Sequence, residues 1–94
     1  MLSKEPIDLE KISPENIDKE ILRLGIIAEL DAVNLYEQLA EKTKNQNIKK
    51  ILLDIAKEEK THVGEFQALL LELDKEQEKE LEEGKKEVEE ELGI

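Results

Sequence analysis

The chain has 94 residues, a formal net charge of −11, and charged side chains at 41% of its positions. A chain this short forms one domain, residues 1–94, and its negative charge excludes nucleic acid as a partner, because phosphates would be repelled. It contains no cysteine, which excludes disulfides, thiolate metal sites and cysteine nucleophiles. The first residues do not resemble a signal peptide, and no apolar run approaches the ~20 residues that span a bilayer, so we predict a cytoplasmic protein without membrane contact.

We predict an all-α fold that begins with a short arm and a long helix. Residues 1–12 contain Pro6 and scattered apolar side chains, which predicts an extended arm. A first helix is predicted over residues 13–43, with Ser13 as its N-cap and Pro14 at the first helical position. Its apolar side chains follow helical spacing in two adjacent stripes, so this helix needs more than one packing partner.

The short turn after this helix predicts an antiparallel hairpin. In residues 43–47, either Asn45 or Asn47 can cap the next helix. A second helix is predicted over residues 47–73, antiparallel to the first. Inside the first helix, Gly25 is less favourable than alanine by roughly 1 kcal/mol of helix stability. We expect that this glycine has a packing role, which is to permit close approach of the second helix.

The last part of the chain has a different character, because it is dominated by glutamate and lysine. A third, short helix is predicted over residues 74–92, with Asp74 as its cap and Gln77 in the capping-box position. Its few apolar residues share one narrow seam: Leu81, Val88 and Leu92. The seam favours a docked helix and the high charge favours a solvated, partly frayed tail, and the sequence leaves both open.

Two ionisable side chains interrupt the apolar stripe of the second helix. Glu59 and His62 lie one helical turn apart on that stripe, where burial without compensation is costly. Glu29 lies on an apolar stripe of the first helix, about as far before the turn as Glu59 lies after it. An antiparallel hairpin therefore places the three side chains at one level. A bound metal ion would compensate for their burial, and this combination is the pattern of di-iron carboxylate bundles.

The three residues form half of such a site. A complete site takes a glutamate from each of two helices and Glu-x-x-His from each of two others. We therefore predict that two chains, each an antiparallel two-helix hairpin plus a short C-terminal helix, dimerise into a ferritin-like four-helix bundle. A single hairpin cannot cover both apolar faces of its helices, which favours the same dimer.

Carboxylates and imidazole without sulfur suit iron, manganese or zinc. Tyr36 lies on the stripe of Glu29 and is either a contact of the centre or a core tyrosine bonded to a carboxylate. Asp31 interrupts the apolar surface near Glu29 and is a candidate for an acidic access path. Three alternatives stay open: a metal-free oligomerisation module with a polar cluster, a manganese or zinc structural site, and a rubrerythrin-like peroxidase. A rubrerythrin-like peroxidase usually adds a cysteine-bound iron site, and this chain has no cysteine.

The segment from Ile27 to Tyr36, together with Glu58-Glu59-Lys60-Thr61-His62, resembles the encapsulated ferritins. It is less specifically similar to the wider ferritin-like group, which includes rubrerythrins. The resemblance implies a ferroxidase that oxidises Fe(II) to Fe(III) at a di-iron centre between two subunits. It also implies assembly of dimers into a ring, typically a decamer, inside an encapsulin shell that stores the ferric mineral.

By motif position, the resemblance assigns candidate roles to five residues. Glu29, Glu59 and His62 match iron ligands and catalytic residues. Tyr36 matches a tyrosine near the centre, and Asp31 an acidic position of an outer metal site. Some members have a glutamate where this chain has Ala28 and a tryptophan where it has Leu35, so the match is weaker at the outer site than at the centre.

The chain end Leu92-Gly93-Ile94 resembles the core of encapsulin targeting peptides, although Gly93 suits a helix stop equally well. In some archaeal members the ferritin segment is fused ahead of the shell protein. We therefore expect either a cargo protein or a segment of such a fusion.

Overall fold

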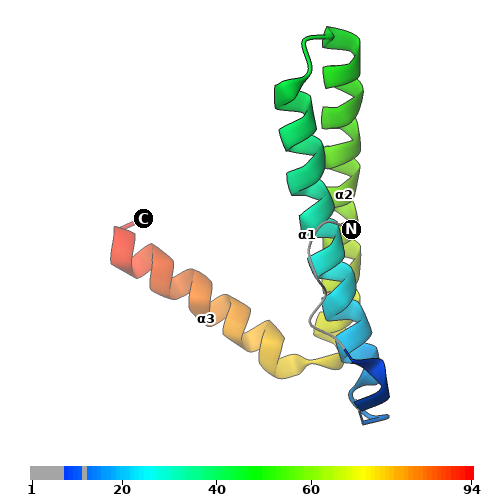
Figure 1. Cartoon of the computed structure of the whole chain (residues 1–94). Coiled ribbons are helices and arrows are strands. Elements are labelled where there is room, and N and C mark those ends of the chain that lie inside the picture. Colours follow the sequence, from blue (N-terminus) through cyan, green and yellow to red (C-terminus); the bar gives the residue numbers. More distant parts are fainter. Residues whose placement is uncertain (1–7, 12) are drawn as a thin grey trace.

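The computed structural model describes residues 8–11 and 13–94, and these residues form helices and no strand. One 3-10 turn and three α-helices follow one another along the chain: η1 (Leu9–Lys11), α1 (Ile17–Lys42), α2 (Gln46–Leu73) and α3 (Lys75–Leu92). Helices α1 and α2 lie side by side as a hairpin, and α3 leaves its base at a wide angle (Figure 1). The predicted all-α fold is confirmed. None of the described helices is long and apolar enough to cross a membrane.

The start of α1 differs from the prediction. The helix begins at Ile17 and not at Ser13, because Ser13 opens a turn instead of capping the helix. The Asn16 amide donates to the Ser13 carbonyl at 3.0 Å, and the Asn16 side chain donates to the Ser13 hydroxyl at 3.0 Å. Asn16 therefore occupies the N-cap position, without a side-chain cap bond. The predicted arm falls mostly outside the described residues, and Leu9–Lys11 form a turn and not an extended segment.

The turn between α1 and α2 has the predicted chemistry. The Asn45 side-chain oxygen accepts the amide hydrogens of Asn47 at 2.9 Å and Ile48 at 3.1 Å, so Asn45 caps α2. These bonds satisfy two of the amides that a helix N-terminus leaves without partners. So short a connection makes α1 and α2 antiparallel neighbours.

Asp74 alone separates α2 from α3. Its amide donates to the Leu70 carbonyl at 2.8 Å, and its carboxylate accepts the Gln77 amide at 3.0 Å, which confirms the predicted cap. The Arg23 guanidinium of α1 donates to the same carboxylate at 2.8 Å. One residue thus links all three helices. Beyond it, α3 is continuous, and none of its residues is buried.

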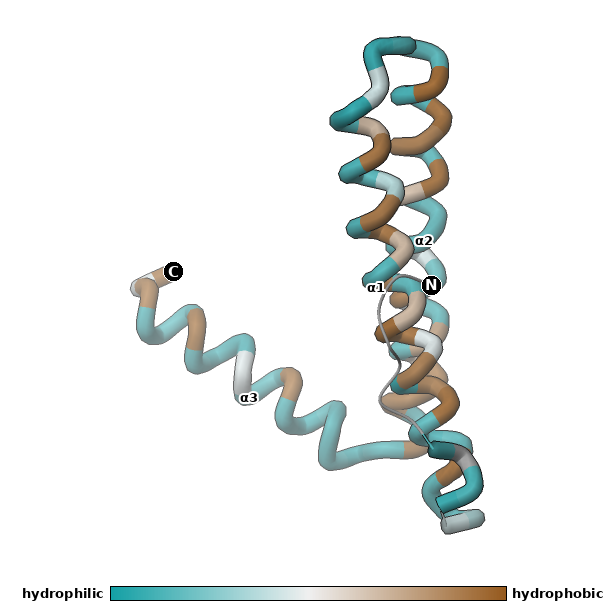
Figure 2. Tube along the Cα trace, viewed as in Figure 1, coloured by the Kyte–Doolittle hydropathy of each residue, from teal (hydrophilic) through white to brown (hydrophobic). Residues whose placement is uncertain are grey.

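The hairpin has a thin core of its own. Its buried residues lie on the facing sides of the two helices: Val33, Ala40, Ala56 and Leu70. A Cβ built on Gly25 would lie 3.2 Å from ring carbons of Phe66, so the predicted close approach of the helices is confirmed. Apolar residues are spread along both helices (Figure 2), and many of the large ones are exposed. The hairpin therefore has more apolar surface than its own fold can cover.

Candidate metal centre

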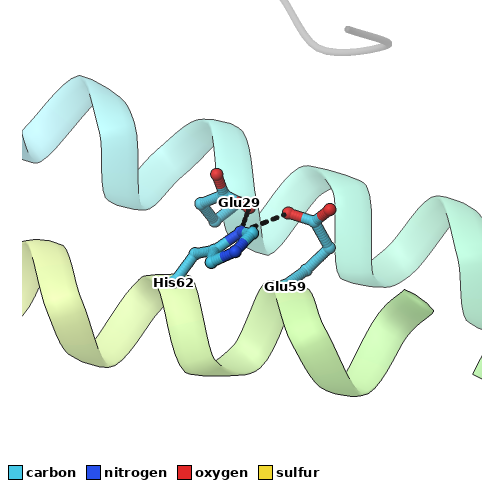
Figure 3. A group of neighbouring side chains, drawn as sticks. All are labelled: Glu29, Glu59 and His62. Carbon is cyan, nitrogen blue, oxygen red and sulfur yellow. Dashed lines mark hydrogen bonds and ion pairs between the residues drawn. The ribbon is translucent and has the colours of Figure 1, made fainter. Parts of the chain in front are cut away.

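Three of the predicted site residues meet partway along the hairpin. Glu29 comes from α1, and Glu59 and His62 come from successive turns of α2 (Figure 3). Each offers one possible ligand atom, and these atoms lie within 4.8 Å of one another. Within residues 8–11 and 13–94, this is the one group of three or more histidine and carboxylate side chains with that geometry. The antiparallel turn produces the meeting, because it brings residues equally distant from it to one level.

The imidazole lies between the two carboxylates. His62 Nδ1 is 3.4 Å from Glu29 Oε2 and 3.3 Å from Glu59 Oε2. Carboxylate oxygens accept hydrogen bonds, so both contacts are hydrogen bonds in the tautomer of His62 that carries its hydrogen on Nδ1. The side chains of Glu29 and Glu59 are 20% and 19% exposed, and that of His62 is 44% exposed. Two half-buried carboxylates facing one imidazole keep a net negative charge in either protonation state of the ring, which favours a cation.

The side of the hairpin that exposes His62 is apolar. We call it the site face, and its large exposed apolar residues come from both helices: Ile21, Leu39, Ile48, Ile51, Leu69 and Leu73. On α2 these residues share a side with His62 by helical spacing, and on α1 Ile21 and Leu39 are about five turns apart. At the base of the hairpin, Ile21, Leu69 and Leu73 line one groove. Monomeric proteins rarely expose such a surface, so the site face has the character of an interface.

Tyr36 and Asp31 are outside the converging group. Tyr36 is half-buried on the same side of α1 as Glu29, about two turns further along. Asp31 is also half-buried, but residues two apart on a helix point about 200° apart. The side chains of Asp31 and Glu29 therefore leave α1 on opposite sides.

One contact beside the site was not predicted. Lys60 Nζ lies 3.0 Å from Glu37 Oε2 and so joins α2 to α1. Lys60 lies two residues before His62 and so points about 200° around the helix from it, which places the ion pair on the side opposite the site face. Opposite charges are too frequent in this sequence to single out such a pair.

The hairpin is antiparallel, with a glutamate on one helix and Glu-x-x-His at the same level of the other. This arrangement is half of a ferritin-like carboxylate bundle. Comparison with known proteins agrees with this class. The family model for rubrerythrin matches residues 20–93. The chain is 56% identical, over its whole length, to a ferritin-like–encapsulin shell fusion protein of Pyrococcus furiosus, of which it spans 28%. It is 45% identical over 56 residues to the encapsulin nanocompartment cargo protein EncC of Myxococcus xanthus, a match that covers 60% of this chain and 43% of that protein.

The fold is also that of a solved structure. The crystal structure of the encapsulated ferritin domain from Pyrococcus furiosus matches all of this chain and 98% of that domain, with a TM-score of 0.85 and 56% identity. The chain therefore belongs to the rubrerythrin family and, within it, to the encapsulated ferritins. The resemblance that the motifs indicated is confirmed.

Proposed function

We propose that this chain is half of a ferroxidase, which two copies complete by joining their site faces. The observation that carries the proposal is the convergence of Glu29, Glu59 and His62 on an apolar, exposed side of the hairpin. Two copies related by a two-fold axis supply four carboxylates and two imidazoles, the ligand set of a ferritin-like metal pair. The same contact would bury the exposed apolar residues of the site face.

Ferrous iron is the substrate, and oxygen or a peroxide accepts its electrons. The donor set fits iron, because it combines carboxylate oxygens with one imidazole per metal and no sulfur. Glu29 and Glu59 offset the charge of the cation. A metal ion on His62 Nδ1 would take the place of a hydrogen on that nitrogen, and the neutral ring would then carry its hydrogen on Nε2.

We assign supporting roles to two further residues. Tyr36, on the same side of α1 as Glu29, lies near the oxidised centre, and Tyr36→Phe should slow oxidation several-fold without changing the amount of bound iron. Asp31 belongs to an acidic access path outside the centre. Asp31→Asn should slow oxidation at low iron concentration and leave the rate at saturating iron unchanged.

The relatives support a cellular setting for this activity. By their names, one is an encapsulin cargo protein and another is fused to an encapsulin shell. We infer that dimers of this chain form a ring, typically a decamer, inside an encapsulin shell in the cytoplasm. The ferric product would accumulate there as stored mineral.

Anaerobic titration of ferrous iron into metal-free protein, followed by oxygen, tests the proposal. We expect about one iron per chain, and ferric absorbance that rises quickly only in assembled protein. His62→Ala should lose most of the oxidation and keep its helical circular dichroism. Binding without oxidation would leave a structural or manganese site, and no binding would leave a polar cluster in an oligomerisation module. A normal oxidation rate in His62→Ala would exclude the assignment.

A further inference from the structure

The turn of α2 that carries two of the candidate ligands also carries an ion pair to α1. Lys60 lies between Glu59 and His62 in the sequence, and its Nζ atom lies 3.0 Å from Glu37 Oε2. Lys60 is two residues before His62, and Glu37 is two residues before Leu39 of the site face. Both charged side chains therefore point about 200° around their helices from that face. This turn thus has ligands on one side and a contact with the other helix on the opposite side.

The candidate ligands repel one another across the two helices in metal-free protein. The carboxylates of Glu29 on α1 and Glu59 on α2 carry the same charge, and they lie 3.4 Å and 3.3 Å from one nitrogen of His62. Their repulsion favours a wider spacing of α1 and α2 at this level. The attraction between Lys60 and Glu37 acts between the same two helices and favours a closer spacing. The separation of the ligands therefore depends on both interactions.

Helix spacing matters here because a metal site needs its ligand atoms within about 0.2 Å of the ideal distances. Two ion pairs flank Glu29 along α1. Arg23 lies about 9 Å from it along the helix axis and bonds to Asp74, and Glu37 lies about 12 Å from it in the other direction. Asp74 follows the last residue of α2, far from the ligands. The contact with Glu37 is therefore the one attached to the ligand-bearing turn.

The side chains of Lys60 and Glu37 are 59% and 46% exposed, and an exposed ion pair contributes little to the free energy of unfolding. We propose that Lys60, through Glu37, is a positioning residue of the metal centre. It holds the turn of Glu59 and His62 at the separation from α1 at which Glu29 shares a metal ion with them. This inference rests on the proposed function, because it concerns the same ligands.

Titration of ferrous iron into metal-free protein under nitrogen tests this role, with Lys60→Gln compared with Lys57→Gln. Lys57 lies one turn before Lys60 on the same side of α2, is exposed, and takes part in no ion pair among the described residues. Each variant removes one positive charge near the site, which by itself would raise the affinity for a cation. We expect several-fold weaker iron binding in Lys60→Gln and no weakening in Lys57→Gln. Equal iron affinities in the two variants would overturn the proposal.

The charge-swapped variant Glu37→Lys/Lys60→Glu separates position from charge. Each single change places like charges on the two helices, so both should weaken iron binding, whereas charge alone predicts tighter binding for Lys60→Glu. The swap keeps the net charge, restores the attraction and should regain most of the affinity. A swap that binds no better than the single variants would overturn the proposal. If wild type bound no iron, the proposed function would fail, and this inference with it.

Distances in metal-free protein test the same role without iron. The chain has no native cysteine, so spin labels can be attached through Asn34→Cys on α1 and Thr61→Cys on α2, both at exposed positions. Labelled chains are diluted with unlabelled ones, so that only distances within one chain are measured. Pulsed electron paramagnetic resonance should give longer or more broadly distributed distances in Lys60→Gln than in Lys57→Gln. Identical distributions in the two variants would overturn the positioning role even if wild type binds and oxidises iron.

Discussion

A Cβ built on Gly25 would lie 3.2 Å from two ring carbons of Phe66, so this glycine determines how closely α1 approaches α2. Gly25 lies one helical turn from Glu29, and Phe66 lies one turn from His62. The contact therefore controls the spacing of the two helices beside the site. A side chain at position 25 would move the ligands of one helix relative to those of the other.

Gly25→Ala should lower both stability and iron affinity. Alanine favours the helix by about 1 kcal/mol, but overpacking a tight contact costs about 1–3 kcal/mol. We therefore expect the free energy of unfolding to fall by about 1 kcal/mol, and urea unfolding at fixed protein concentration measures this change. Gly64→Ala is the control, since nothing lies within 4 Å of a Cβ built there, and it should be neutral or stabilising. Unchanged stability and iron affinity in Gly25→Ala would contradict the role of the contact.

Glu59→Gln should separate stability from metal binding. The change keeps the shape of the side chain and removes one charged ligand, so iron affinity should fall at least about tenfold. In metal-free protein it also removes the repulsion between two carboxylates around one imidazole, so the free energy of unfolding should not fall. Isothermal titration and chemical unfolding measure the two effects. The control Glu41→Gln changes an exposed glutamate of α1 about three turns from Glu29 and should change neither. Equal losses of affinity in both variants would remove Glu59 from the site.

Substitutions at two adjacent leucines should have different effects, one on the folding of the hairpin and the other on the pairing of two chains. Leu70 is 4% exposed in the core of the hairpin, whereas Leu69 is 57% exposed on the site face. Leu70→Ala should lower the free energy of unfolding by about 2–5 kcal/mol. Leu69→Gln should keep the helical content, weaken pairing on dilution, and reduce the iron bound per chain at low protein concentration. Sedimentation over a dilution series checks this, and unchanged pairing would argue against the site face as the dimer interface.

Asp74 should contribute to the stability in a pH-dependent way. The hydrogen bond from the Gln77 amide lowers its pKa from the ordinary value of 3.8, and the Arg23 guanidinium adds to this, against an opposing effect of burial. A lowered pKa in the folded state means that the unfolded chain binds the proton more readily. The contribution is therefore fully present above pH 3.8 and is lost as the pH falls through the folded pKa. Asp74→Asn keeps a capping side chain without the charge.

Acid titration of the unfolding transition tests this contribution. Asp74→Asn should show a shallower loss of stability below about pH 4 than wild type. Asp54→Asn, on an exposed edge of α2, is the control and should follow the wild-type curve. A wild-type slope in Asp74→Asn would mean that the interactions of Asp74 do not depend on its charge.

Much of the site could be predicted because it depends on spacing along two helices joined by a short turn. Glu29, Glu59 and His62 were expected at one level, and their ligand atoms lie within 4.8 Å of one another. The start of α1 could not be predicted in the same way. Ser13 is a good capping residue, but its hydroxyl bonds to the Asn16 side chain, and the helix begins after that turn. Competition between alternative local hydrogen bonds decided this boundary, and no periodic pattern records it.

The sequence by itself determined the three helices, the antiparallel hairpin and the juxtaposition of the Glu29 and Glu59-x-x-His62 side chains, because helical periodicity and a short turn are local properties. Only the tertiary structure decided the direction of α3 and which apolar residues gather with His62 on the site face. The direction of α3 depends on the contact between Arg23 and Asp74, which lie 51 positions apart in the sequence. The site face depends on how the side chains of α1 and α2 combine once the two helices pack, which neither helix specifies alone.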